Sequence, residues 1–300
     1  MAYIDARKSR WGVQPICKVL HFAPSTYYAA TTRAPSNRSV ADEELKPKIE
    51  DVYEDNLSVY GARKIWAELK RQGTKVARCT VERLMGDIGI VGVSKSKSAV
   101  RTTIADELAD RPQDLVRRNF TADRPNELWV ADITYIDTAI NKTYVAFVID
   151  VFSRKVVGWK VSSSLKTDLA TDALDMAIYQ RNYLDNLDNL VHHSDRGSQY
   201  LSIKYSQRLQ DYGIAPSVGS KGDSYDNALA ESFNGLYKAE LIRRKKSWKN
   251  VQDVEWATLL YIDWFNNRRI HSKLGMIPPV EYEAIYYAKK QACEPIGSQG

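Results

Sequence analysis

Three acidic side chains that lie far apart in the sequence have the residue types and settings that metal-dependent phosphodiester chemistry requires. Asp132 lies inside a strand-like run, LWVADITYI, where a charge is costly to bury unless it is paired or binds a metal. Asp195 ends a second, shorter strand-like run, LVHHSD. Glu231 lies in a helix-like run, and Asn227 and Asn234 share its helix face. A carboxylate between two carboxamides either faces solvent or has a partner.

Convergence of these acids would create a site for divalent cations. Three neighbouring carboxylates repel one another, and their hard oxygen atoms select Mg²⁺ or Mn²⁺ over zinc. Two such ions activate an attacking oxygen and stabilise a leaving oxygen in phosphodiester chemistry. We expect Asn227 and Asn234 either to lie behind the metal ligands or to face DNA, and His193 to orient the site, whereas His192 packs at a strand end. The competing interpretation of Glu231 is an ordinary solvated helix face.

The elements around the acids are predicted to follow one another as strand, strand, strand, helix, strand, helix, strand, helix. β-Branched and aromatic residues mark the strands. This α/β order matches a ribonuclease H-like domain, which is a mixed five-stranded sheet with flanking helices. In that sheet the first and fourth strands are neighbours and the last helix packs beside them, so that the three acids converge. The predicted strands are 127–138, 143–153, 155–164, 190–195 and 213–219, and the predicted helices are 168–182, 203–213 and 222–235.

The part of the chain before this domain is predicted to be helical. Residues 1–39 hold one short helical pattern followed by a polar stretch. Residues 40–93 hold three helical patterns, and a short turn that contains Gly73 joins the last two. Two helices joined in this way favour a helix-turn-helix that binds DNA. A small helical bundle without a DNA partner has the same apolar spacing and is the alternative.

Three further segments complete the predicted organisation. Residues 94–120 form a basic linker that lacks apolar periodicity. Residues 121–247 form the ribonuclease H-like core. Residues 248–300 form a helical C-terminal extension and tail, in which a long aromatic-rich helix is followed by a loop with Pro278 and Pro279.

Composition excludes several classes of protein. The chain has 300 residues and a formal net charge of +6, which permits a nucleic-acid partner without requiring one. We expect no membrane span, because no run of 18 apolar residues occurs, and no signal peptide is evident. Three widely spaced cysteines form neither a disulfide framework nor a metal motif, which fits a reducing cytoplasm.

Four stretches together resemble one family of enzymes. They are LWVADITYI, HSDRGSQY, DNALAESFNGLYKAEL and NNRRIHSKLGMIPPVEY. The chain resembles, over about residues 40–285, the DDE transposases of the insertion-sequence-three family. The resemblance is to the product of their downstream reading frame (OrfB-type), within the retroviral integrase superfamily. Thirty-five residues separate Asp195 from Glu231, the spacing typical of that superfamily. The resemblance implies Asp132, Asp195 and Glu231 as catalytic metal ligands for two Mg²⁺ or Mn²⁺ ions.

The resemblance also implies partners and a location. The DNA partners would be the terminal inverted repeats of an insertion sequence and a target DNA. A homodimer or larger assembly would hold two DNA ends together, and an upstream-frame protein with a helix-turn-helix is a further implied partner. A location in the bacterial cytoplasm, at the nucleoid, follows. We expect no zinc, because the chain lacks the His-His-Cys-Cys module of retroviral integrases.

Several basic residues are predicted to contact DNA. Arg268 and Arg269 have an alternative role as caps at a helix C-terminus, and Trp248 is predicted to be available for stacking on bases. The other residues predicted to bind DNA are Lys238, Arg243, Arg244, Lys245 and Lys246 of the core, and Lys95 and Lys97 of the linker.

We therefore expect a transposase that binds the ends of an insertion sequence and catalyses metal-dependent strand cleavage and strand transfer. One alternative is a non-catalytic DNA-binding regulator derived from a transposase, against which the intact acid set argues. The other is a ribonuclease H-like nuclease, which would cleave without joining strands.

Overall fold

The computed structural model describes residues 1–94, 114–116, 119–182, 187–195, 197–219 and 227–293. The chain divides into two compact units, Met1–Asp51 and Val52–Gly300, and each is described by itself.

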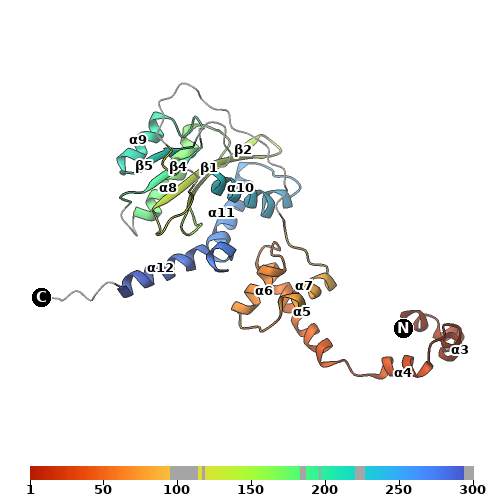
Figure 1. The fold of residues 1–300 in the computed structure, drawn as a ribbon. Helices are drawn as coiled ribbons and strands as arrows, with labels where there is room; N and C mark the ends of the chain where they lie inside the picture. Colours follow the sequence, from red (N-terminus) through yellow and green to blue (C-terminus); the bar gives the residue numbers. More distant parts are fainter. Residues whose placement is uncertain (95–113, 117–118, 183–186, 196, 220–226, 294–300) are drawn as a thin grey trace. The chain divides into compact units, whose positions relative to one another are not determined.

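The first unit contains four short helices and the start of a fifth (Figure 1). A small core of Ile4, Ile16, Cys17 and Tyr27 holds the short helices together. One short helix and a polar stretch were predicted here, so the sequence pattern underestimated the helical content. The five helices are α1 (Ala2–Asp5), α2 (Lys8–Trp11), α3 (Val13–Val19), α4 (Pro24–Thr32) and α5 (Asn37–Asp55).

The second unit begins with the end of α5 and with two helices, α6 (Ala62–Arg71) and α7 (Arg78–Asp87). Their apolar stripes are buried, with Ile65 and Leu69 on α6 and Leu84 on α7 fully inaccessible. Gly73 has a φ of 84°, the left-handed region that favours glycine and ends the α6 helix. The three helical patterns predicted in residues 40–93 are confirmed.

A five-stranded mixed sheet forms the centre of the second unit, as predicted. Its order is β3-β2-β1-β4-β5, in which β1 pairs antiparallel with β2 and parallel with β4. The predicted adjacency of the first and fourth strands is therefore confirmed. The strands are β1 (Leu128–Asp137), β2 (Lys142–Asp150), β3 (Val156–Ser162), β4 (Val191–Ser194) and β5 (Ala215–Val218), and the helices that follow them are α8 (Thr167–Asn182), α9 (Ile203–Asp211) and α10 (Ala228–Glu240).

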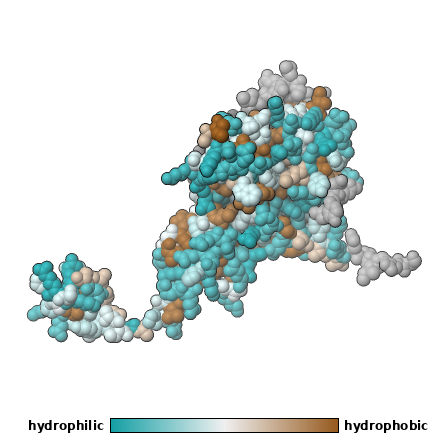
Figure 2. Space-filling model, turned by 180° about the vertical axis from the view of Figure 1, so that it is seen from behind, coloured by the Kyte–Doolittle hydropathy of each residue, from teal (hydrophilic) through white to brown (hydrophobic). Residues whose placement is uncertain are grey.

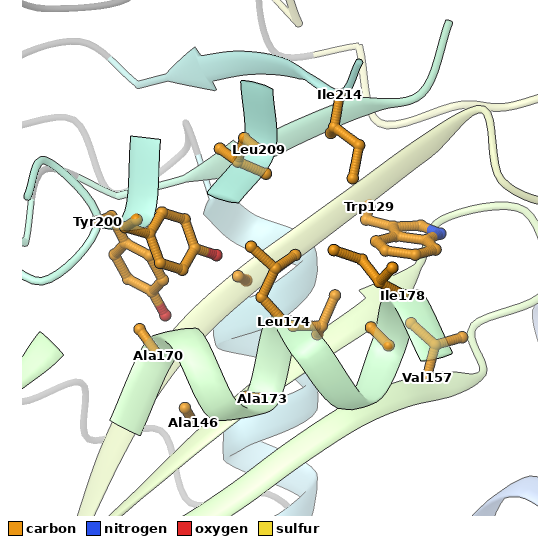
Figure 3. Packing of buried hydrophobic residues seen from close by; sticks show 14 of the residues in the cluster. Trp129, Ala146, Val157, Ala170, Ala173, Leu174, Ile178, Tyr200, Leu209 and Ile214 are labelled. Atoms are coloured by element: carbon orange, nitrogen blue, oxygen red, sulfur yellow. The ribbon is translucent and has the colours of Figure 1, made fainter. Parts of the chain in front are cut away.

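The main core lies where α8 and α9 pack on the sheet (Figure 3). Trp129 of β1 and Leu174 of α8 are fully buried in it. Gly158 of β3 allows α8 to approach closely, since a Cβ there would lie 2.1 Å from the Ala173 carbonyl oxygen. Close packing of α8 keeps rigid the sheet that carries Asp132 and Asp195.

The C-terminal part contains two long helices, α11 (Val251–Asn267) and α12 (Pro279–Cys293), and two short 3-10 helices, η2 (Ile242–Arg244) and η3 (Ser272–Leu274). The prediction of a loop at Pro278 and Pro279 was wrong for Pro279, which begins α12. Proline suits the first helical turn, because its fixed φ is helical and its missing N–H is not needed there. Within the described residues, no helix has the length and apolar character needed to cross a membrane.

A buried ion pair attaches α12 to the sheet. Glu283 accepts hydrogen bonds from both terminal nitrogens of Arg181 on α8, and from Ser153 Oγ at 2.6 Å. Burial alone would raise the pKa of Glu283, but Arg181 and Lys155 hold that pKa below its usual value. Asp150, the last residue of β2, accepts bonds from the same Ser153. Both acids therefore stabilise the junction between α12 and the sheet.

Candidate active site

The sheet register places two of the three predicted acids side by side. The parallel pairing of β1 with β4 ends at Ala131 and Ser194. Asp132 directly follows the first of these residues, and Asp195 directly follows the second. A short turn after Asp195 fixes its carboxylate, because Gly197 N–H donates to Asp195 Oδ1 at 3.0 Å. The first two acids of the predicted set are thus presented at one edge of the parallel pair.

Helix α10 is joined to β1 by the two carboxamides that flank Glu231. Asn227 Nδ2 donates to the Ala131 carbonyl oxygen at 2.9 Å, and Asn234 Nδ2 donates to Asp132 Oδ2 at 2.8 Å. Both asparagines are buried, whereas Glu231 is exposed. The two carboxamides therefore join α10 to β1 and hold Glu231 beside the strand that carries Asp132.

The side chain of Asn227 does not make the helix-capping hydrogen bond that its sequence position suggests. Its sequence setting suits a residue that caps the helix through its side chain. Asn227 does occupy the N-cap position of α10, but its side chain makes no capping hydrogen bond. The side chain instead donates to the Ala131 carbonyl oxygen on β1, which lies 96 positions earlier in the chain.

The three carboxylates lie close enough to influence one another's protonation. Burial and the neighbouring Asp195 raise the pKa of Asp132 to about 8, and Glu231 adds to that shift. Burial and Asp195 also raise the pKa of Glu231. Asp132 and Glu231 therefore resist losing their protons beside a charged Asp195, the situation that a bound cation relieves.

The donor atoms fit a hard divalent cation by their chemistry. Asp132 and Asp195 offer carboxylate oxygens at adjacent positions, and Glu231 offers a third, more exposed carboxylate. In the described part of the chain, no group of three histidine, cysteine or acidic side chains is arranged to hold one ion together. The fit therefore rests on the carboxylate chemistry and the mutual repulsion.

Comparisons with known proteins identify the family of the chain. Models of the integrase core domain match residues 122–224 and 212–279, and a model of the HTH-like domain matches residues 40–98. The transposase for insertion sequence element IS629 of Shigella sonnei is 51% identical over 293 residues, which are 96% of this chain and 97% of that protein. The chain belongs to the insertion-sequence-three family of transposases.

A second transposase and one solved protein domain are also similar to the chain. The transposase for insertion sequence element IS3411 of Escherichia coli is 47% identical over 186 residues, which are 60% of this chain and 77% of that protein. The catalytic core domain of HTLV-2 integrase, in complex with magnesium, aligns with 54% of this chain and 98% of its own chain. That alignment has 19% identity and a TM-score of 0.42.

The side chains of the two neighbouring histidines of the transposase, His192 and His193, contact the elements packed beside β4. His192 is buried and its Nε2 lies 3.0 Å from Tyr205 Oη on α9, which confirms the predicted strand-end packing. His193 Nδ1 lies 2.9 Å from Ser217 Oγ on β5 and 4.0 Å from Asp114 Oδ1. These contacts connect β4 to its neighbours, and the proposed orienting role of His193 stays a prediction.

Burial of His192 predicts a loss of stability in mild acid. Burial, together with the charge of His193, lowers the pKa of His192 from its ordinary value of 6.5 to about 3. The unfolded chain therefore takes up a proton first, and the stabilising effect of neutral His192 is lost as the pH falls from 6.5 towards 3. We expect the slope from this one proton to approach about 1.4 kcal/mol per pH unit.

His192→Asn should remove this part of the slope while keeping a polar group beside Tyr205. Urea unfolding at pH 7 and pH 5 measures the effect. His271, with a pKa lowered to about 2 by burial, also contributes, so the variant should flatten the pH dependence and not abolish it. If the free energy of unfolding changes between pH 7 and pH 5 by the same amount in wild type and in His192→Asn, the assignment is contradicted.

Two of the predicted DNA contacts need correction. Arg269 is buried, and its guanidinium donates to both oxygens of Glu240 at the end of α10, at 2.8 Å and 2.5 Å. It is therefore an internal ion pair and not a DNA contact. Trp248 is 4% exposed, and its indole N–H donates to the Ile242 carbonyl oxygen. Burial of the ring excludes the predicted stacking on bases.

The remaining predicted DNA contacts differ in accessibility. Lys238 lies on α10 with its Nζ 4.9 Å from the centre of the Tyr135 ring, which Lys142 also contacts. Lys245 pairs with Asp253 at 2.6 Å, and Arg244 donates to the Leu57 carbonyl oxygen. Arg243, Lys246 and Arg268 are exposed, and Lys95 and Lys97 lie outside the described residues.

Sequence reasoning missed Tyr135 as part of this surface. Tyr135 lies on β1, three residues after Asp132, and the two lysines Lys142 and Lys238 lie over its ring. The contact joins residues from β1, β2 and α10, so no local pattern marks it. An aromatic residue close to the predicted acid Asp132 in the same strand was the available signal.

Proposed function

We propose that the transposase cleaves DNA at the ends of its insertion sequence and joins the new ends to a second strand. The observation that carries this proposal is the convergence of Asp132, Asp195 and Glu231 in a chain of this transposase family. The HTH-like region would bind the terminal inverted repeats, and the carboxylate edge would act on the phosphodiester. Two ends must be processed together, so a homodimer or larger assembly on DNA is expected.

Asp132, Asp195 and Glu231 are the residues that would hold two Mg²⁺ or Mn²⁺ ions. When bound, the ions supply activation of an attacking oxygen and stabilisation of a leaving oxygen. The chain itself supplies positioning. The turn at Gly197 orients Asp195, the Asn234 amide orients Asp132, and Asn227 joins the start of α10 to β1.

Lys238 is suited to a DNA phosphate near the carboxylates. It lies two turns after Glu231 on the same helix, and burial lowers its pKa while nearby Asp132 partly restores it. A lysine cation two turns after Glu231 would attract the phosphate backbone of DNA, which the three acids repel. Its role would be to position DNA.

A strand-transfer assay tests the proposal. The purified chain is incubated with a labelled duplex that ends in the element's inverted repeat, with Mg²⁺ or Mn²⁺ and with or without an upstream-frame partner. Cleaved and joined products support a transposase. Cleavage without joining would favour a nuclease, and binding without either product would favour a regulator.

Asn234→Ser should lower strand transfer about tenfold to a hundredfold, because groups that orient a metal ligand typically have effects of that size. The substitution removes the amide that donates to Asp132 Oδ2. Asn267→Ser is the matched control, since the Asn267 amide is exposed and bonds only along its own helix to Asp263. Equal activities of the two variants would contradict a positioning role for Asn234.

A further inference from the structure

The first unit of the chain contains two packed helices joined by a short turn, separate from the HTH-like domain that matches residues 40–98. The matching family models begin at residue 40, whereas α3 and α4 lie before it. Four residues, 20–23, separate these two helices. A turn of three to four residues between two packed helices is the defining feature of a helix-turn-helix.

The turn has the backbone geometry that a sharp helix corner requires. His21 has a φ of 50°, the left-handed region, and Phe22 N–H donates to the Cys17 carbonyl oxygen at 2.9 Å. This bond closes the end of α3 and turns the chain into α4, which begins at Pro24. Histidine is one of the residues that tolerate this conformation.

One face of α4 is fixed to the rest of the unit. Tyr27 is buried in the small core with Ile16 and Cys17 of α3. Its hydroxyl donates to Asp5 Oδ1 at 2.6 Å, and Lys8 Nζ lies 2.9 Å from the same oxygen. The hydrogen bond and the ion pair hold α4 against the first two helices and neutralise the single acid of residues 1–33.

The other face of α4 is exposed, and the segment of residues 1–33 that carries it is rich in cations. Ser25, Thr26, Tyr28 and Ala29, in the first turns of the helix, are exposed. Arg7 stacks on the ring of Tyr3 at 4.0 Å, and Arg10 stacks on Trp11 at 4.9 Å. The side of this unit drawn in Figure 2 is mostly hydrophilic or neutral. The exposed cations of this segment are Arg7, Lys8, Arg10, Lys18 and Arg33.

We propose that residues 1–33 bind duplex DNA, with α4 in the major groove. In a helix-turn-helix the N-terminal residues of the second helix read base edges while basic residues around it contact phosphates. Ser25, Thr26 and Tyr28 have the position and the polar atoms for the first role. The exposed cations of residues 1–33 have the charge for the second, because the single acid of the segment, Asp5, is already paired with Lys8. The inference rests on the proposed function for its DNA, the end of the element.

Hydroxyl-radical footprinting with the full chain tests the inference. The probe is a labelled duplex carrying the element's terminal inverted repeat, in EDTA, so that the result is independent of cleavage. Wild type should protect two separate segments. Ser25→Ala with Thr26→Ala, and separately Tyr28→Ala, should lose one segment, keep the other, and bind about tenfold to a hundredfold more weakly.

The salt dependence of binding tests the phosphate contacts. Arg10→Ala with Lys18→Ala should reduce the slope of log K against log salt by about 2, one for each lost phosphate contact. The matched controls are Lys289→Ala with Lys290→Ala, two exposed cations on α12, and Tyr179→Ala, a tyrosine that is 84% exposed on α8. Circular dichroism confirms that each variant is folded.

An unchanged footprint and an unchanged salt slope in the folded variants would overturn the inference. If the same variants bind DNA normally but fail to assemble with a second copy or an upstream-frame protein, the open face of α4 is a protein-docking surface and the inference is also wrong. Normal cleavage and joining by variants with an unchanged footprint would leave the proposed function standing while this inference fails.

Discussion

Glu231→Gln should reduce strand cleavage and strand transfer by about a thousandfold or more, the scale on which loss of a group essential to chemistry acts. The side chain is exposed on α10, and glutamine keeps its size and helix propensity, so the fold should be unaffected. What is lost is one negative charge from a group of three that interact electrostatically. Binding to the inverted-repeat duplex, measured in EDTA, should be unchanged.

The control for this prediction is Glu44→Gln, an exposed acid on α5. It removes one charge of the same kind from a helix without disturbing the carboxylate edge, and should cleave and join strands as wild type does. Parallel losses in both variants would show that overall charge, and not the position of Glu231, controls the reaction. Wild-type activity of Glu231→Gln would remove Glu231 from the proposed metal ligands.

Arg181→Met should lower the free energy of unfolding by about 3–5 kcal/mol, the usual cost of removing one partner from a buried ion pair. Arg181 is 1% exposed, and it lies between two buried acids, since its charge acts on both Glu283 and Asp150. Methionine has a similar length but removes the guanidinium that acts on both carboxylates, and Glu283 keeps only its pairing with Lys155 at 3.2 Å. Chemical denaturation monitored by tryptophan fluorescence measures the change.

Arg208→Met is the matched control for this second prediction. Arg208 pairs with Asp175 at 2.5 Å, but both side chains are more than a third exposed, so solvent screens the pair. We expect little change in stability from this variant. A similar cost at both positions would mean that burial does not determine the strength of these pairs. The double variant Arg181→Met with Glu283→Leu should recover part of the loss, because it removes one of the two buried acids that lose the Arg181 guanidinium.

The local pattern of the sequence was sufficient for most of the regular elements. Alternation and β-branched residues marked all five strands, and apolar spacing marked α6 to α11, because both periods reflect which side of an element meets the core. The pattern failed in two parts of the chain. In residues 1–39 only one short helix was predicted, and α1, α2 and α4 were missed. At α12 the two prolines were interpreted as a loop, although Pro279 begins the helix.

The order and chemistry of the acids were also evident from the sequence. Asp132 in a strand, Asp195 after a strand and Glu231 on a helix predicted a site once the strand order was known, because parallel neighbours present their ends at one edge. The sheet confirms that order. The role of the set in cleavage stays a prediction that the variants above test.

The partners of individual polar side chains were decided by tertiary structure alone. Asn227 looked like a helix cap but bonds to β1, and Arg269 looked like a DNA contact but is paired with Glu240. Arg181 gave no local sign of its pairing with Glu283, 102 positions away. A side chain's type limits what it can bind, but its burial and its partner depend on which distant segments the fold brings against it.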